Sequence, residues 1–361
     1  MKSRLVVVLV CGLALVACGS DDEPSPGPVR VNPAPAGQPW ATLAEWRLFA
    51  DGRQAKPAER VVPFDVISPL WSDDTVKERY LYVPEGETIG YEDTARWKFP
   101  VGTILVKTFA YPIDARDLTL GRRLLETRLL VHEASGWTAH TYVFDETESS
   151  TSYTIAGATL EAAWIDEAGE SRTHAYKVPD LNQCAQCHGL SAPDTLGGVT
   201  RQLDRDNDYG GGSKNQLDHF AELGLLPGLP PASERERLTS PTGSAAVTLR
   251  ARSYLDANCA HCHAEGGQAA QSGLLLGWLS TAVGPNVNWG VCKVPTSAGG
   301  ATCGLSHDIV PGEPDKSVLV CRMESRVPSI QMPTLGTGLV DHAGVAVIRE
   351  WIAGLEPTGC Q

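Results

Sequence analysis

Residues 244–263 read SAAVTLRARSYLDANCAHCH, and this stretch indicates the fold of the C-terminal third of the chain. Ala245–Leu255 is a predicted helix that carries Leu249 and Tyr254 and leads directly into the CAHCH segment, Cys259–His263. The C-x-x-C-H spacing is that of c-type haem attachment. Two thiols one helical turn apart can each add to a haem vinyl group, and the adjacent histidine is then the proximal iron ligand. Cys259, Cys262 and His263 are therefore the expected haem-binding residues.

A second copy of the spacing lies upstream, as CAQCH at residues 184–188. Cys184 and Cys187 would hold a second covalent haem, with His188 as its proximal ligand. The alternatives are a structural zinc site and a redox-active C-x-x-C pair. Zinc ribbons favour reducing compartments and the redox motif needs a βαβ context, so two complete motifs behind an export signal favour two c-type haems.

The sixth iron ligands differ between the two motifs. Met332, in the Gln331-Met332-Pro333 loop before the last predicted helix, is the expected distal ligand of the second haem, because a thioether favours reduced iron. Met323 is expected instead to be a buried helical residue. No methionine lies between the two motifs. The first haem therefore has His219 as a candidate ligand, with His174, His140 and His132 as upstream alternatives, or a vacant position; His261, His307 and His342 are expected to be solvated.

Residues 40–178 have the character of an antiparallel β-domain, a sandwich or a barrel-like fold. Short runs with β-branched or aromatic residues alternate with turn signals: Arg79–Val83, Arg96–Tyr111, Leu124–His132, Trp137–Phe144, Ser152–Ile155 and Ala162–Ile165. Beyond residue 178 helical segments are expected at Asn215–Leu223 and at Asp341–Leu355, where the apolar residues have helical spacing. The expected class is multidomain α+β. Trp71–Asp74 combines an aromatic residue with carboxylates, and we expect a packed strand end there, with a sugar or cation site as the alternative.

The N-terminus indicates an exported, lipid-anchored protein. Residues 1–17 have a charged start and a short apolar stretch, which is typical of a signal peptide. Leu15-Val16-Ala17-Cys18 resembles the bacterial lipobox, so Cys18 is the expected lipidated residue, and residues 18–39 form a proline-rich tether. The expected location is the cell envelope, as an outer-membrane or inner-membrane lipoprotein that faces the periplasm or the cell surface. The lipid would be its membrane contact.

Four further cysteines remain once the haems and the lipid are assigned. An even number in an oxidising compartment predicts two disulfides, with three possible connectivities. Pairing by proximity would join Cys292 to Cys303 across the loop between them, and Cys321 to Cys360 behind the last helix.

Composition excludes several classes of protein. The 361 residues have 30 basic and 43 acidic side chains, a net charge of −13, and contain no basic blocks. Nucleic acid is therefore not an expected partner. The chain contains no nucleophile elbow, phosphate loop or dinucleotide fingerprint. An acidic surface could steer a basic redox partner.

Several phrases carry a family resemblance: Phe99-Pro100-Val101-Gly102-Thr103, Trp289-Gly290-Val291-Cys292-Lys293 and Ile309-Val310-Pro311-Gly312-Glu313-Pro314. The chain resembles a family of exported bacterial haem-c proteins with an N-terminal β-region and a C-terminal class I cytochrome c-like domain. The resemblance implies haem binding and electron transfer, with no established substrate. In class I cytochromes the first and last helices cross through an aromatic contact, for which Tyr254 and Trp351 are the candidates.

The expected organisation is thus a signal peptide (1–17), a tether (18–39), a β-rich domain (40–178), a first haem-binding segment (179–243) and a cytochrome c-like domain (244–361). The expected function is single-electron transfer between redox proteins, such as cytochromes or a periplasmic oxidoreductase. One alternative is a peroxidase-like haem enzyme whose first haem is five-coordinate. Another is a binding protein whose β-domain captures a partner while the cytochrome module is accessory.

Overall fold

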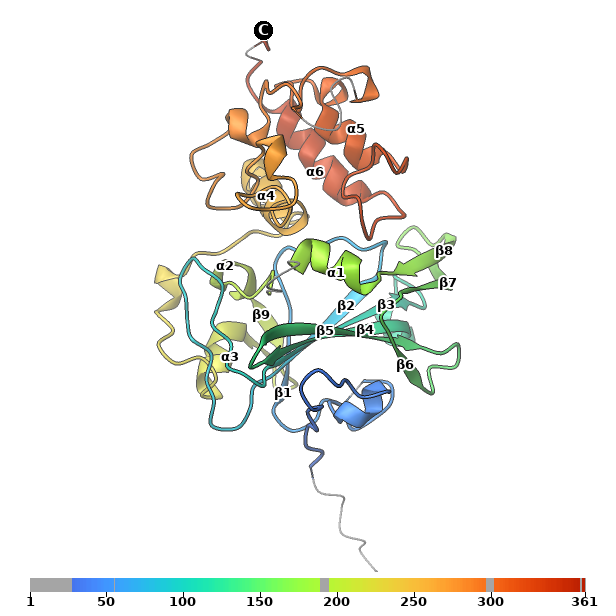
Figure 1. Cartoon of the computed structure of the whole chain (residues 1–361). Coiled ribbons are helices and arrows are strands. Elements are labelled where there is room, and N and C mark those ends of the chain that lie inside the picture. The colour runs from blue at the N-terminus through green and yellow to red at the C-terminus, as the bar shows by residue number, and fades with distance from the viewer. Residues whose placement is uncertain (1–27, 55, 189–194, 297–301, 358, 361) are drawn as a thin grey trace, which may run out of the picture.

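A computed structural model describes residues 28–54, 56–188, 195–296, 302–357 and 359–360. The predicted signal peptide and Cys18 lie outside these residues. Figure 1 shows a sheet-rich part, residues 28–229, next to a helical part, residues 244–360, with helix α1 between them. The mixed α+β class and the antiparallel N-terminal region are confirmed. Among the described residues no helix is long and apolar enough to cross a bilayer.

The sheet-rich part is built on one six-stranded antiparallel meander, in which each strand pairs with its neighbours in sequence. Its strands are β1 (Val61–Phe64), β2 (Val76–Tyr82), β3 (Ile104–Pro112), β4 (Arg122–Glu133), β5 (Gly136–Phe144) and β6 (Thr151–Thr154). The edge strands β1 and β6 have four residues each, and within the described part of the chain they do not pair with each other. The sheet is therefore open, and the barrel-like alternative is wrong.

A separate hairpin of β7 (Ala158–Ile165) and β8 (Ser171–Val178) packs beside the sheet. Trp164 and Tyr176 of the hairpin contact Phe109, Tyr111 and Leu125 of β3 and β4 in one buried cluster. The rings of Tyr111 and Trp164 stack with their centroids 4.1 Å apart. Strands β1 and β8 were not expected from the sequence. In β8, polar and charged residues occupy most of the positions.

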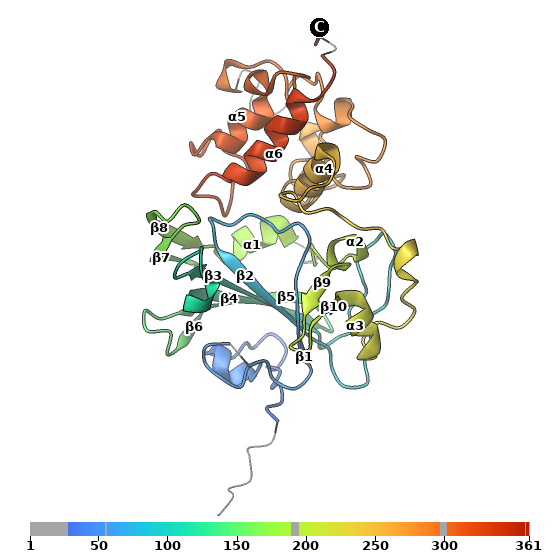
Figure 2. The ribbon, with the colours of Figure 1, turned by 180° about the vertical axis from the view of Figure 1, so that it is seen from behind.

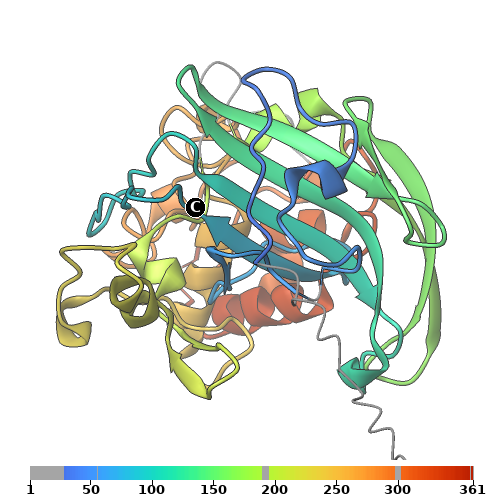
Figure 3. The same cartoon turned by 90° about the horizontal axis from the view of Figure 1, so that it is seen from below.

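Opposite faces of the meander bury different clusters, as the two-residue period of a strand requires. Val61, Tyr80 and Val106 face the N-terminal segment, where the 3-10 helix Leu43–Trp46 crosses the sheet (Figure 3). The adjacent residues Val62 and Leu81 face the other way and pack with residues of α2 (Thr200–Leu203) and α3 (Gln216–Glu222). Figure 2 shows these two helices from behind. The segment 199–229 therefore packs on the sheet and is not a separate unit.

The remaining short elements of the chain connect these layers. They are strands β9 (Asp206–Asp208) and β10 (Ser213–Asn215), and the 3-10 helices Leu118–Leu120, Ala232–Glu234, Ala270–Ser272, Val287–Trp289, Thr302–Gly304 and Pro314–Lys316.

The helical part contains α4 (Val247–Asn258), α5 (Val318–Glu324) and α6 (His342–Ala353) around one apolar cluster. Helix α4 matches the helix predicted at Ala245–Leu255, and α6 matches the one predicted at Asp341–Leu355. In the sheet-rich part, α3 matches the helix predicted at Asn215–Leu223. Helices α4 and α6 cross where Gly344 of α6 lies against the ring of Tyr254 on α4. The Tyr254 hydroxyl also hydrogen-bonds Asp341. Trp351 instead packs on Trp289, with ring centroids 5.3 Å apart. The predicted aromatic crossing therefore uses Tyr254 and a glycine.

Two disulfides form in the helical part, but with a different connectivity from the one expected. Cys292 bonds to Cys360 and Cys303 bonds to Cys321, with Cα–Cα distances of 5.0 and 6.6 Å. The pairing by proximity in sequence was wrong, because the chain passes α5 and α6 in between and brings Cys360 beside Ile309, next to Cys292.

Polar contacts join the two parts of the molecule. Ser68 Oγ donates to the carbonyl of Ser253 (2.9 Å), and the Trp71 backbone N–H donates to Asn258 Oδ1 (2.7 Å). The Leu339 N–H donates to Asp73 Oδ1 (2.8 Å). The segment before β2 thus holds both the end of α4 and the loop before α6.

Candidate functional site

A cavity of about 1550 Å³ lies between the sheet-rich part and the helical part. Both C-x-x-C-H segments line it, although they are distant in the sequence. The lining residues predicted as haem ligands or attachment points are Cys184, Cys187, His188, Cys259, Cys262, His263 and Met332. Small-molecule sites usually enclose roughly 300–1,000 Å³, so this cavity has room for more than one ordinary ligand.

The first segment ends helix α1 (Leu181–His188), which follows β8 after a two-residue turn. Asp180 begins the helix: its carboxylate accepts the Gln183 N–H (2.8 Å), and the Gln183 side chain accepts the Asp180 N–H (3.0 Å). This reciprocal cap satisfies two helix-terminal donors. With the helix start so determined, Cys184 and Cys187 lie one turn apart on the same face. Burial raises the pKa of Cys184.

The second segment follows α4 without a break. Cys259 caps the helix, and the His263 N–H donates to its carbonyl (2.9 Å), which continues the helical turn through the motif. Asn258, the last residue of α4, is buried, and its side chain also donates to the Pro69 carbonyl (3.3 Å). The motif is therefore held against the sheet-rich part. Burial raises the pKa of Cys259 to about 12.

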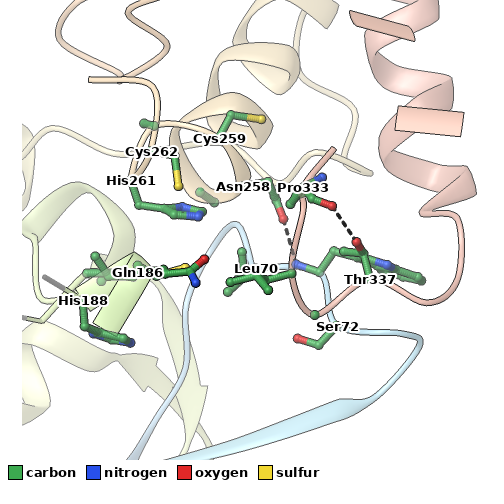
Figure 4. Close-up of a pocket in the computed structure, with 18 of the residues that line it drawn as sticks. Leu70, Ser72, Gln186, His188, Asn258, Cys259, His261, Cys262, Pro333 and Thr337 are labelled. Carbon is green, nitrogen blue, oxygen red and sulfur yellow. Dashed lines mark hydrogen bonds between the residues drawn. The ribbon is translucent and has the colours of Figure 1, made fainter. Parts of the chain in front are cut away.

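The two segments meet through their thiols. Cys187 donates a hydrogen bond to Cys262, which raises the pKa of Cys187 to about 12 and lowers that of Cys262. Figure 4 shows His261 and Cys262 extending toward Gln186 of α1. His261, predicted to be solvated, is half-buried, and its side chain also hydrogen-bonds Cys187.

His263 has one ring nitrogen occupied by the protein. Its Nδ1 lies 3.0 Å from Ser272 Oγ, which also accepts the Leu274 N–H (3.2 Å). Burial, followed by the charge of Arg322, lowers the pKa of His263 to about 4. The imidazole is therefore neutral at pH 7, and with the proton on Nδ1 its Nε2 carries a free lone pair.

Met332 lies in a loop that is held by its backbone. The Met332 N–H donates to the Arg322 carbonyl (2.9 Å), and Arg322 Nε donates to the Ile330 carbonyl (2.8 Å). Thr337 Oγ1 donates to the Pro333 carbonyl (2.8 Å), a contact drawn in Figure 4. Met323 is buried on α5, as predicted, and also reaches the cavity wall.

The histidines considered for the first motif separate into two groups. His219 is not among the described lining residues; its ring stacks on Tyr209 with centroids 3.7 Å apart. His132 is also absent from the lining residues, and its ring stacks on Trp137 with centroids 4.6 Å apart. His140 belongs to the lining residues, although its ring lies 6.0 Å from that of Trp46. His174 does line the cavity, where its Nε2 lies 3.2 Å from Asp73 Oδ2. The structure thus does not bring His219 to the first motif.

Trp71–Asp74 has a structural role in this arrangement. Asp73 is buried, and besides Leu339 and His174 it accepts a hydrogen bond from Tyr111 through its carbonyl (2.6 Å). These contacts support the interpretation as a packed strand end.

Within the described residues no group of three or more His, Cys, Asp or Glu side chains has the geometry to hold a metal ion.

A set of basic residues on the cavity wall was not predicted from the sequence. Arg79, Lys107 and Arg128 are direct cross-strand neighbours on β2, β3 and β4, and all three line the cavity. Each lies two residues from a leucine on the same strand, Leu81, Leu105 or Leu130, and these leucines also line the cavity. The two-residue period of a strand could therefore have placed the three basic side chains on the same face. We call these three residues the basic row.

Comparisons with protein-family models, with curated proteins and with solved structures find no match. The resemblance to exported bacterial haem-c proteins therefore stays a prediction that depends on the motifs.

Proposed function

We propose that the protein is a lipid-anchored dihaem c-type cytochrome that passes single electrons between redox partners. The observation that carries the proposal is that both C-x-x-C-H segments line one cavity and share a hydrogen bond between Cys187 and Cys262. Electron exchange between two centres weakens steeply with distance, so adjacent attachment points favour a relay.

The residues present fit covalent haem. Four thiols line a cavity that is larger than a single ligand needs, and each pair has the spacing that two vinyl additions require. His263 offers a neutral ring with Nε2 unoccupied, while Ser272 holds Nδ1, the kind of outer contact that orients a metal-binding imidazole. The group supplies a one-electron iron centre when it is bound.

The chain's own contacts orient the second pair of axial residues. His263 and Met332 both line the cavity and would hold the second haem iron: Ser272 contacts the other nitrogen of the His263 ring, and the Arg322 carbonyl accepts the Met332 backbone N–H. These contacts position the His263 ring and the backbone of the loop that carries Met332. A thioether at this position favours the reduced iron and raises the potential.

The test is haem counting on the full chain matured with c-haem attachment machinery. Intact mass should show two haems in the wild type, one in Cys184→Ser/Cys187→Ser and one in Cys259→Ser/Cys262→Ser. The matched control is Cys303→Ser/Cys321→Ser, which removes two disulfide cysteines outside the motifs and should retain two haems. Wild-type protein without covalent haem would refute the proposal.

Spectra of the same protein test the axial ligands. Met332→Ala should abolish the long-wavelength methionine-to-iron band, whereas Met323→Leu, which conserves volume in the core, should keep it. Low-spin signals from both haems support an electron carrier. A high-spin first haem with peroxide turnover would support the peroxidase-like enzyme instead.

The proposed anchor has an independent test. Cys18→Ala should move the exported protein from the membrane fraction to the soluble fraction and abolish acyl labelling. Retention in the membrane fraction would contradict the lipoprotein assignment without affecting the haem count.

A further inference from the structure

The basic row is an unusual feature for the interior face of a sheet. Arg79 lies opposite Lys107, and Lys107 lies opposite Arg128, on adjacent antiparallel strands. Like charges directly opposite each other destabilise a sheet. Lys77, two residues before Arg79 on β2, adds a fourth cation on the same face. A row of this kind needs compensating anions.

Protein carboxylates compensate only part of the row. Arg79 Nη1 contacts Asp65 Oδ1 (2.6 Å), and Arg128 Nε contacts Glu126 Oε2 (2.8 Å). Asp65 is shared, because Arg205 binds its other oxygen at 2.6 Å. The Tyr176 hydroxyl donates to Glu126 (2.7 Å) and holds that carboxylate in place. The two carboxylates are thus already engaged by arginines.

Lys107 has no such partner. Within the described residues no hydrogen bond or ion pair reaches its Nζ, which lies over the face of the Phe109 ring, 4.9 Å from the centroid. Glu126 acts on Lys107 only through its charge, and its oxygens are bound by Arg128 and Tyr176. The Arg128 guanidinium lies over the same ring at 4.2 Å. An unpaired cation taken out of water is costly. Burial and the neighbouring cations accordingly lower the pKa of Lys107.

The first haem-attachment segment lies over this row. Cys184 and Arg128 both line the cavity and interact electrostatically, with Tyr176 and Phe109 in the same wall. Haem c bears two propionate carboxylates, which are the anions that a group attached at Cys184 would bring into the cavity.

We propose that the basic row binds the propionate carboxylates of the haem attached at Cys184 and Cys187, with Lys107 at the centre of the contact. This inference rests on the proposed function and assigns the orientation of the first haem: its carboxylate edge faces the sheet. Lysine and arginine donors make strong charge-assisted hydrogen bonds to carboxylates. The same pairing removes the cost of the unpaired Lys107 cation.

The test compares Lys107→Gln with two controls in the full, haem-loaded chain. Lys107→Arg keeps the charge, and Lys98→Gln removes an exposed lysine whose side chain is 79% accessible and pairs with Glu92. Loss of the cation leaves a propionate uncompensated, which favours ferric iron. In Lys107→Gln the reduction potential of one haem should fall by ~59 mV, which is a tenfold change in the equilibrium constant of a one-electron reduction. Both controls should stay close to wild type.

Folding is measured separately, on haem-free protein. There Lys107→Gln should be as stable as wild type or more so, because the substitution removes an unpaired buried charge. Loss of stability in the haem-free variant would show that the lysine has a protein partner, and would overturn the inference.

Each further outcome is also decisive. Two attached haems with unchanged potentials in Lys107→Gln overturn this inference alone, whereas wild type without haem overturns the proposed function as well. A low-spin to high-spin change in the variant would show that the amine binds iron and not a carboxylate. Lys107-dependent binding of inorganic phosphate to haem-loaded wild type would show that the row serves soluble anions instead.

Discussion

The substitution Gly344→Ala tests the helix crossing that positions the second motif. An ideal Cβ at this position of α6 would lie 2.3 Å from Cε2 of Tyr254 and 2.4 Å from Asp341 Oδ2. The Tyr254 ring cannot move away easily, since it is 5% exposed and its hydroxyl is bonded to Asp341. Alanine gains up to about 1 kcal/mol in helix propensity over glycine. Overpacking typically costs about 1–3 kcal/mol, and contacts as close as 2.3 Å place this site in the upper part of that range, about 2–3 kcal/mol, so we expect a net loss of about 1–2 kcal/mol.

The measurement is urea unfolding of haem-free protein, monitored by circular dichroism. Gly354→Ala is the matched control, because its Cβ would meet only the Glu350 carbonyl at 3.5 Å and the Trp351 carbonyl at 3.6 Å. The control should be neutral or slightly stabilising. If Gly344→Ala were as stable as the control, α4 and α6 would not approach as described, and the crossing would be wrong.

Three further predictions concern the contacts around the site. Cys303→Ser should lower the free energy of unfolding by about 3 kcal/mol and Cys360→Ser by about 4 kcal/mol, because the Cys292–Cys360 disulfide closes a loop of 68 residues and the Cys303–Cys321 disulfide one of 18. Denaturant unfolding measures both losses, and a peptide map under non-reducing conditions checks the pairing. Burial lowers the pKa of Lys77 from 10.5 to about 7, so the unfolded chain binds more protons between these values and stability should rise with pH across that window, at up to ~1.4 kcal/mol per pH unit. Unfolding at pH 7, 8 and 9 should show the rise in wild type and a flatter profile in Lys77→Met; equal slopes would contradict the burial of this amine. Asp73→Ala should destabilise the protein by about 1–3 kcal/mol, since the Leu339 N–H loses its acceptor, whereas exposed Asp117→Ala should cost less in the same assay.

Local sequence patterns predicted much of the secondary structure. The apolar period of Asp341–Leu355 becomes α6, and the helix before Cys259 becomes α4. Strands β2 to β7 coincide with the predicted runs to within a few residues, except that β3 (Ile104–Pro112) covers only the second half of Arg96–Tyr111. Strand β8 escaped prediction because its outward positions are polar and its burial depends on the neighbouring sheet.

Residue type and short-range spacing were enough to predict the attachment motifs, the four remaining cysteines, Met332 as a candidate ligand and the periodicity of the main helices. The open sheet, the disulfide partners, the placement of His219 outside the cavity lining and the convergence of both motifs on one cavity required the packed structure. The basic row belongs to the same group, since Arg79, Lys107 and Arg128 become neighbours only through strand register. The physical reason is that local spacing reports which face a side chain takes, while contacts between distant segments depend on how whole elements pack.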